Sequence, residues 1–456
     1  MNLASDHVRV LILSSEFPPG PGGIGNHACH LAKELTLNGC EVLVLTPQEF
    51  VSAETSAAFN QTQGFRIHTL HQGQHTLSKA ISRYRVLNRQ ICEFKPDILI
   101  ASGSHSVWLA AASAPRHRVP WVAVGHGSEF SNLKNLGTAI TRHAFNKADC
   151  VIFVSHFTRQ VAHEAGITPR AEMVIHNGAD GHFFKPGSAG VKQKIAAQMG
   201  FTASDPLLLT VGNLTRRKGQ EVVISALPEV LQNFPNARYL MAGLPTEKER
   251  LSQLAAELGV KDRVTFLGNI DSVRLLELYQ ACDIFLMTSQ RCDNGDVEGF
   301  GISVIEAALC GKPAIVSADS GLAEAVEDGI TGICVPEKDP HATADAIMRL
   351  LSDEHLRQTL GRQALERAAA WLTRVQSRDG SWRGNPQGGE SYPCAMTGLA
   401  GLALLAVAIS DGNTGADSVS VIDTRNDIEV TSPTLPEPTP KLHPQEIARL
   451  PLGRAL

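Results

Sequence analysis

The feature that most constrains the fold is a repeated alternation of short apolar runs with helix-like stretches. The runs of the first series are rich in β-branched residues and occupy residues 8–13, 41–46, 97–102, 119–124 and 149–155. Strands that alternate with helices form a parallel sheet with helices packed on both faces. The N-terminal part is therefore predicted to be an α/β, Rossmann-like doubly wound domain.

The alternation weakens once, between residues 186 and 204, and then starts again. The second series occupies residues 207–212, 237–243, 263–268, 283–289 and 313–318. A chain of 456 residues is too long for one ordinary core. We therefore predict Rossmann-like domains at 1–185 and 205–370, joined by a linker at 186–204. Ligands bind at the C-terminal ends of the strands in such sheets, so a cleft between the domains is the expected site.

The pattern breaks after residue 370. An Ala/Leu/Gly-rich stretch suggests a helical extension at 371–410, and the proline-rich, charged residues of 411–456 predict a disordered tail. Five residues of the extension are Gln376, Asp379, Gly380, Ser381 and Trp382. Through them, 371–407 resembles one repeat of the terpenoid cyclase and prenyltransferase α/α barrels. One repeat cannot close such a barrel, so we expect no cyclase activity, and we expect self-association through the apolar helix 394–409.

Composition excludes several classes of function. The net charge is −5 and no dense Lys/Arg patch occurs, which argues against nucleic-acid binding. None of the nine cysteines forms a C-x-x-C pair, which is typical of reduced thiols in a cytoplasmic protein. No apolar stretch reaches the roughly 18 residues of a membrane span. Any membrane contact is therefore expected to be peripheral, at the inner face of the cytoplasmic membrane.

The stretch 75–94 allows two interpretations. Its apolar residues recur at helical spacing, and basic residues occupy the other positions. Such a helix can lie on an anionic membrane that carries a lipid-linked acceptor. The favoured alternative is that it packs on the core with a solvated basic face.

A glycine-rich loop follows the first predicted strand. Its glycines Gly20, Gly22 and Gly25 match the G-x-G-x-x-G dinucleotide fingerprint. However, six residues separate the strand from these glycines, and the second strand ends in Thr46 instead of an acidic residue that would bind a ribose. A dinucleotide-binding oxidoreductase and a merely structural turn thus stay as lesser alternatives. In the favoured interpretation, Gly22 and Gly23 let the backbone approach a phosphate or sugar.

The second domain opens with a strand followed by three consecutive cations, Arg216, Arg217 and Lys218. Like charges at a strand end repel one another unless an anion binds there. A diphosphate is such an anion. The alternative is a solvated basic turn.

The segment EGFGISVIE, residues 298–306, sets two glutamates around glycines at the start of a helix-like stretch. Helix N-termini favour anions. If a diphosphate binds Lys218, Arg217 and the amides of 299–301, the carboxylates can hold the hydroxyl groups at its two ends. Glu306 then suits a ribose diol and Glu298 the second sugar. Acidic residues that merely favour a helix start would explain Glu298, but not Glu306.

Taken together, the segments GPGGIG, GHGSEF, VIHNGAD, TRRKGQ and EGFGISVIE resemble glycosyltransferase family 4, of the GT-B fold, over about residues 8–370. The resemblance implies retaining transfer of a sugar from a UDP- or GDP-sugar substrate, with no cofactor and no metal. The acceptor would be a glycan or a lipid-linked glycan in cell-surface polysaccharide biosynthesis. A catalytically silent scaffold with the same fold is the rival interpretation.

The resemblance also implies roles for individual residues. The catalytic residues would be His126, Lys218 and Glu298, and Glu129 would lie on the acceptor side. The donor site would comprise Gly22, Gly23, Arg216, Arg217, Lys218, Gly268, Glu298, Gly299, Phe300, Gly301, Ile302 and Glu306. Many members of the family carry an arginine where this chain has Asn213, so Arg216 or Arg217 would replace its charge. Asp293 and Asp296 are interpreted as solvated, and no metal site is expected.

Overall fold

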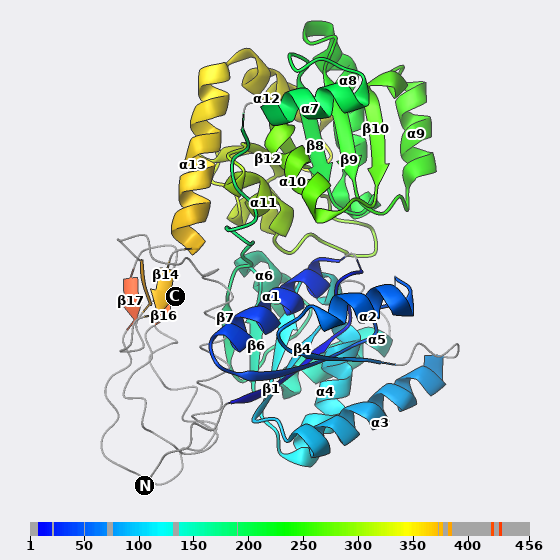
Figure 1. The fold of residues 1–456 in the computed structure, drawn as a ribbon, viewed down its shortest axis with the longest axis vertical. Coiled ribbons are helices and arrows are strands. Elements are labelled where there is room, and N and C mark those ends of the chain that lie inside the picture. Colours follow the sequence, from blue (N-terminus) through cyan, green and yellow to red (C-terminus); the bar gives the residue numbers. More distant parts are fainter. Residues whose placement is uncertain are drawn as a thin grey trace.

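The computed structural model describes residues 8–372, apart from 21, 50, 71–75, 131–135 and 189, together with 374–376, 382–384, 421–423 and 428–430. It shows two α/β domains, the first in blue and cyan and the second in green and yellow (Figure 1). Each domain is built on its own parallel sheet. The predicted doubly wound architecture is confirmed.

The N-terminal domain contains a seven-stranded parallel sheet in the order β3-β2-β1-β4-β5-β6-β7. Its strands are β1 Arg9–Ser14, β2 Glu41–Thr46, β3 Arg66–Thr69, β4 Ile98–Ser102, β5 Trp121–Gly125, β6 Cys150–Phe153 and β7 Glu172–Val174. Its helices are α1 Gly23–Leu37, α2 Ala53–Gln61, α3 Thr76–Phe94, α4 Ser104–His117, η1 Ser128–Phe130, α5 Leu136–Lys147 and α6 His156–Glu164. The central strands β1, β4 and β5 are almost wholly buried because helices cover both faces of the sheet.

The C-terminal domain contains a six-stranded sheet in the order β10-β9-β8-β11-β12-β13. Its strands are β8 Leu207–Val211, β9 Arg238–Ala242, β10 Val264–Gly268, β11 Ile284–Met287, β12 Ala314–Ser317 and β13 Gly332–Val335. The helices of this half are α7 Gly190–Met199, η2 Arg216–Lys218, α8 Gln220–Asn233, α9 Lys248–Glu257, η3 Lys261–Arg263, α10 Ser272–Ala281, α11 Ile302–Leu309, η4 Gly321–Glu324, α12 Pro340–Ser352 and α13 Glu354–Leu372.

All ten predicted strands form, but the sequence patterns missed three edge strands, β3, β7 and β13. Each has only three or four residues, and β3 and β7 carry polar or charged side chains, so neither shows an apolar run. The segment 186–204, predicted as a linker, contains helix α7, which packs against α10 and buries Ile195 and Ala196. The helix was missed because its apolar positions are few.

The chain beyond the second sheet folds back on it. Helix α13 packs against α11 and buries Ala364 and Ala368. In the predicted helical extension, β14 Arg374–Gln376 pairs antiparallel with β15 Trp382–Gly384, so these residues are strands and not helix. In the predicted disordered tail, β16 Val421–Asp423 pairs with β17 Ile428–Val430. The predicted apolar helix 394–409 and the rest of the tail lie outside the described residues.

Helix α3, for which two interpretations were open, buries Leu87, Ile91 and Phe94 in the N-terminal core. Its basic face is only partly solvated, because Lys79 and Arg83 both pair with Glu49. The core-packing interpretation therefore holds for the apolar face. No helix among the described residues is long and apolar enough to cross a membrane.

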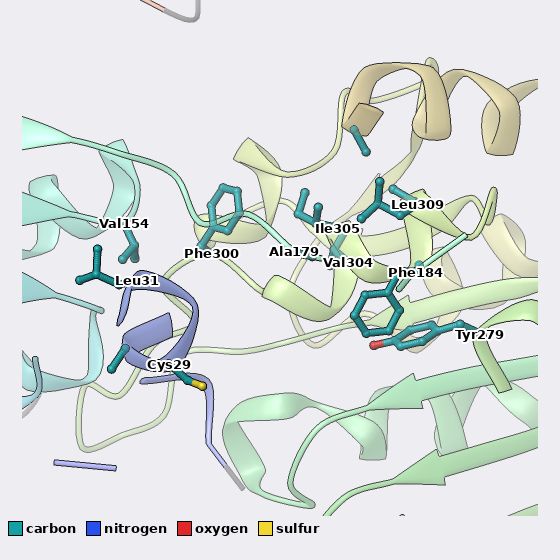
Figure 2. Close-up of a cluster of buried hydrophobic side chains, with 14 of the residues drawn as sticks. Cys29, Leu31, Val154, Ala179, Phe184, Tyr279, Phe300, Val304, Ile305 and Leu309 are labelled. Carbon is teal, nitrogen blue, oxygen red and sulfur yellow. The ribbon is translucent and has the colours of Figure 1, made fainter. Parts of the chain in front are cut away.

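Apolar packing continues from one domain to the other. Phe300, in the loop before α11, is only 3% exposed and belongs to the same core cluster as Leu31 and Val154 of the N-terminal domain. Figure 2 shows its ring between these side chains and those of α11, represented by Val304. The loop that carries the EGFG motif is thus packed between the two domains.

Candidate active site

The basic turn after β8 is shaped by a glycine that no other residue can replace without strain. Gly219 has φ +67°, and a Cβ there would lie 1.8 Å from the carbonyl oxygen of Thr288. This turn closes the short helix η2 and sends Lys218 back over Gly212, whose own Cβ position lies 3.3 Å from the lysine stem. Tertiary packing therefore holds Lys218 at the C-terminal end of β8.

Glu298 supplies the anion that meets these cations in the structure. Its carboxylate pairs with Lys218 Nζ at 2.6 Å and with the guanidinium of Arg217. Burial opposes ionisation of Glu298, but the charges of Arg217 and Lys218 outweigh it and lower its pKa to about 2. Burial lowers the pKa of Lys218, and Glu298 opposes that effect. Arg217, Lys218 and Glu298 thus form one ion-paired cluster in which Glu298 is ionised.

The sequence left open whether Arg216 or Arg217 supplies the charge beside Lys218, and the structure distinguishes the two. Arg217 points into the cluster and also pairs through Nε with Asp296 at 3.2 Å. Arg216 is exposed, and its carbonyl accepts a hydrogen bond from Gln290 Nε2 at 2.9 Å. The prediction that Asp296 is solvated is wrong, since Arg217 draws it against the cluster. Arg216 lies outside the cluster that Arg217 and Lys218 form.

Glu306 lies in the second turn of α11 and faces helix α10. It accepts a hydrogen bond at 2.6 Å from the hydroxyl of Tyr279, a side chain with no exposed surface. Burial raises the pKa of Glu306 to about 7, although Tyr279 and the charge of Lys218 act in the opposite direction. This carboxyl therefore titrates near neutral pH. No motif in the sequence pointed to Tyr279.

The glycines of the EGFG loop allow the two domains to touch through their backbones. A Cβ on Gly299 would lie 1.9 Å from the carbonyl oxygen of His126. The Gly299 carbonyl accepts hydrogen bonds from Ser155 Oγ at 2.6 Å and from Thr158 Oγ1 at 3.2 Å. Gly301, the N-cap residue of α11, adopts φ +80°. The loop before α11 is therefore placed directly against the segment that carries His126.

His126 directly follows β5, and its ring is buried against Ser102 and His27. Its Nε2 lies 2.8 Å from Ser102 Oγ, and its ring meets that of His27 edge to face at 5.0 Å. Burial lowers the pKa of His126 to about 4. Glu129 accepts the backbone N–H of His126 at 3.0 Å, and burial raises its pKa to about 7. The two predicted residues of GHGSEF are therefore brought together, with Glu129 supporting the His126 backbone.

The glycine loop of the N-terminal domain encloses a carboxylate that sequence analysis missed. Gly22 precedes α1 and has φ +155°, and a Cβ there would lie 1.9 Å from the Glu16 carboxylate. Gly23 is exposed, with open space at its Cβ position. Burial raises the pKa of Glu16, and the charge of Arg217, in the other domain, acts in the opposite direction. The loop thus faces the cationic cluster of the other domain.

The remaining predicted donor residues are a glycine at the end of β10 and two residues at or just before the start of α11. Gly268 ends β10 with φ +69°, and its carbonyl accepts the N–H of Gly243 at 2.9 Å. Ile302 begins α11, and Phe300 stacks on His176 with ring centroids 5.2 Å apart.

Among the described residues, His156, His176 and Glu324 bring possible metal-ligand atoms within 4.8 Å of one another.

Each half of the chain matches a known family model. Residues 21–182 match the family model described as Glycosyltransferase Family 4, and residues 191–367 match the one described as Glycosyl transferases group 1. These matches cover both sheets except β1 and end before the C-terminal extension, so the resemblance of 371–407 to α/α barrels has no support. The boundary between them coincides with the start of α7.

The names of similar proteins indicate the class of protein, and a solved structure shows the fold. The chain is 28% identical over 373 residues to the GDP-mannose-dependent alpha-(1-6)-phosphatidylinositol monomannoside mannosyltransferase of Mycolicibacterium smegmatis, covering 77% of this chain and 91% of that protein. It is 27% identical over 386 residues to the D-inositol 3-phosphate glycosyltransferase of Frankia alni, with the same shares. The fold matches that of Anabaena HepE in complex with UDP and glucose, with TM-score 0.68, 23% identity, and 80% and 95% of the two chains covered.

Proposed function

This chain is a glycosyltransferase of the GT-B fold, with a family 4 N-terminal half and a group 1 C-terminal half, and we propose that it is retaining and metal-independent. In this proposal it moves a hexose from a nucleoside-diphosphate sugar to a hydroxyl group of a glycan or glycolipid. The observation that carries the proposal is the ion-paired cluster of Arg217, Lys218 and Glu298, because Gly299, the residue after Glu298, lies against the backbone carbonyl of His126. Cations for a diphosphate and acceptors for sugar hydroxyls therefore lie close to the contact between the two domains.

The donor binds by exchange of partners within the cluster. The diphosphate takes Arg217 and Lys218, because it offers more negative charge and more oxygens than one carboxylate. Glu298, released from them but still ionised, accepts hydrogen bonds from hydroxyls of the transferred sugar. Glu306 accepts from the ribose diol at the other end of the diphosphate. The base lies toward Gly268, where β10 ends in open space.

The chemistry needs no protein base opposite the leaving group. The bond between the anomeric carbon and the phosphate oxygen breaks, and its electron pair stays on the phosphate, where Lys218 and Arg217 stabilise the charge. The acceptor oxygen bonds to the anomeric carbon on the same face. Its proton passes to an oxygen of the leaving diphosphate. His126, neutral near pH 7, orients the sugar through a hydrogen bond.

The names of the relatives narrow the substrates to be tested first. Two of them transfer sugar to inositol-bearing acceptors, and one is named as dependent on GDP-mannose. We therefore take GDP-mannose as the first donor and an inositol phosphate or phosphatidylinositol glycolipid as the first acceptor. A lipid acceptor would bring the exposed Arg85, Arg89 and Ile81 of α3 toward an anionic membrane surface.

The proposal is tested by incubating the full chain with GDP- and UDP-sugars, with and without each acceptor, in buffer containing EDTA. Release of the nucleoside diphosphate is measured, and the anomeric configuration of the product is read by NMR. We expect acceptor-stimulated release and an α-linked product from an α-linked donor. Inversion of configuration would refute the retaining mechanism. Absence of release with every donor would favour a silent scaffold.

A further inference from the structure

Helix α6 of the N-terminal domain has its first turn completed by a residue of the other domain. The carboxylate of Glu324, in η4, accepts the backbone N–H of His156 at 2.9 Å and that of Phe157 at 2.6 Å. The next N–H, of Thr158, is bonded to Ser155 Oγ at 2.8 Å within the helix itself. The N-terminus of a helix carries partial positive charge and unpaired N–H groups, which a carboxylate satisfies well. An interdomain contact thus supplies part of the cap of α6.

Glu324 is held as an anion in this position. Its side chain is 18% exposed, and its Oε2 also lies 2.7 Å from His176 Nε2. Burial would raise its pKa, but His176 and the two backbone N–H groups outweigh burial and lower the pKa to about 2. Both carboxylate oxygens are therefore engaged by hydrogen-bond donors. We accordingly interpret the grouping of Glu324 with His156 and His176 as an interdomain contact and not as a metal site.

The same turn of α6 also seats the donor loop. Ser155 and Thr158 donate to the carbonyl of Gly299, and Gly299 in turn lies against the carbonyl of His126. On the C-terminal side, the N–H of Gly321, which opens η4, donates to the Glu298 carbonyl at 3.1 Å. Helix η4 and the first turn of α6 are therefore both hydrogen-bonded to the loop of Glu298 and Gly299, which runs between them.

We propose that Glu324 is a positioning residue that aligns His126 with the donor loop by fastening α6 to the C-terminal domain. It does not touch the reacting atoms. Glu324 raises the fraction of molecules in which His126 and the donor loop are aligned. Its loss therefore lowers turnover more than it lowers nucleotide affinity. The effect on turnover rests on the proposed function, because His126 must meet the donor sugar. The alignment of the two domains, however, can be tested without any sugar transfer.

The test compares three full-length proteins: wild type, Glu324→Gln and the control Glu327→Gln. Glutamine keeps the size of the side chain but removes the charge, and only one of its two terminal atoms can accept a backbone N–H. Glu327 lies three residues further on and pairs with Arg367 within the C-terminal domain. The control therefore makes the same chemical change without touching α6. The probes are GDP and UDP for binding and the active donor for turnover.

For Glu324→Gln we expect kcat to fall by about tenfold or more, as is usual for the loss of a hydrogen bond to a charged group. The Kd of the nucleoside diphosphate should change by less than about twofold, and Glu327→Gln should match wild type. Hydrogen exchange, followed by mass spectrometry, should speed up in the peptides that cover 298–304 and 121–130. Exchange is measured without substrate, so it tests the alignment even if no donor is turned over.

Two outcomes would overturn the inference. Unchanged exchange in 298–304 and 121–130 would show that Glu324 does not align the domains. Equal losses of kcat and nucleotide affinity, together with a lower melting temperature, would show a general structural role instead. If no donor is turned over by wild type, the proposed function fails, while the exchange result still decides on Glu324.

Discussion

The substitution Glu298→Gln tests the central cluster most directly. Glutamine keeps the shape of the side chain but removes the charge that pairs with Arg217 and Lys218. Arg217 then retains Asp296, whereas Lys218 loses the carboxylate that its buried ammonium contacts. We expect a less stable unliganded protein that responds more strongly to a nucleoside diphosphate.

The magnitude follows from the pKa of Glu298. A fall from the ordinary 4.5 to about 2 corresponds, at about 1.4 kcal/mol for each pH unit, to about 3 kcal/mol in favour of the ionised form. This is comparable to the 3–5 kcal/mol that is typically lost when one partner of a buried ion pair is removed. For a domain of this size, the loss corresponds to a fall of roughly 6–12 °C in melting temperature.

A bound diphosphate replaces the missing anion. At about one hundred times its Kd, a ligand that binds only the folded state adds ~2.7 kcal/mol to stability, so GDP or UDP should recover most of the loss. In wild type the same ligand must displace Glu298, so its stabilising effect is smaller. Turnover of the sugar nucleotide should still fall, because the amide no longer accepts charge-assisted hydrogen bonds from the sugar.

The assay is thermal unfolding of both proteins, with and without GDP and UDP, between pH 3 and pH 8. Because the folded-state pKa of Glu298 is depressed, its stabilising effect is present above about pH 4.5 and is lost as the pH falls toward 2. The difference between wild type and variant should therefore shrink over that interval. A variant as stable as wild type at pH 7, with a smaller response to nucleotide, would refute the reasoning.

Three further predictions concern the same candidate site. Lys218→Ala should lower kcat by about 10²–10³ with a much smaller change in donor Kd, since the cation acts mainly as charge grows on the leaving phosphate; equal losses in both would contradict this. Donor affinity should rise as the pH increases through about 7, because ionised Glu306 is the better acceptor for a ribose diol. Tyr279→Phe should move this rise to higher pH, because it removes a hydrogen bond that favours ionisation of Glu306. A pH profile that does not move would remove Tyr279 from the site. Turnover should survive EDTA, and strict dependence on added Mg²⁺ or Mn²⁺ would overturn the metal-free assignment.

The fold was predictable because its evidence is local. Buried parallel strands such as β1 and β8 appear as continuous apolar runs, and the helices between them appear as amphipathic stretches. Where that evidence is short or weak, prediction failed. The edge strands β3 and β7 have too few apolar residues, and α7 was taken for a linker although Ile195 packs in the core.

The candidate site was predictable only as a set of positions. The cations of the TRRKGQ turn and the glutamates of EGFGISVIE stand out because their charges lie beside glycines at element ends. Their partners do not stand out. Asp296 was interpreted as solvated, and no motif pointed to Tyr279 of α10. The choice between Arg216 and Arg217 depended on which way a single short helix turns.

By itself, the sequence determined the two α/β domains, the strand ends at which chemistry-bearing residues gather, and the class of ligand that those residues suit. Periodicity and local residue chemistry carry this information, and both act over a few neighbouring residues. Only the tertiary structure decided which charges neutralise each other and how the domains meet. Glu324 lies 168 residues from the backbone amide of His156 that it binds, and Gly299 lies 141 residues from Thr158. Contacts between residues so far apart in the chain arise from the packing of two independently formed sheets, and no local pattern records them.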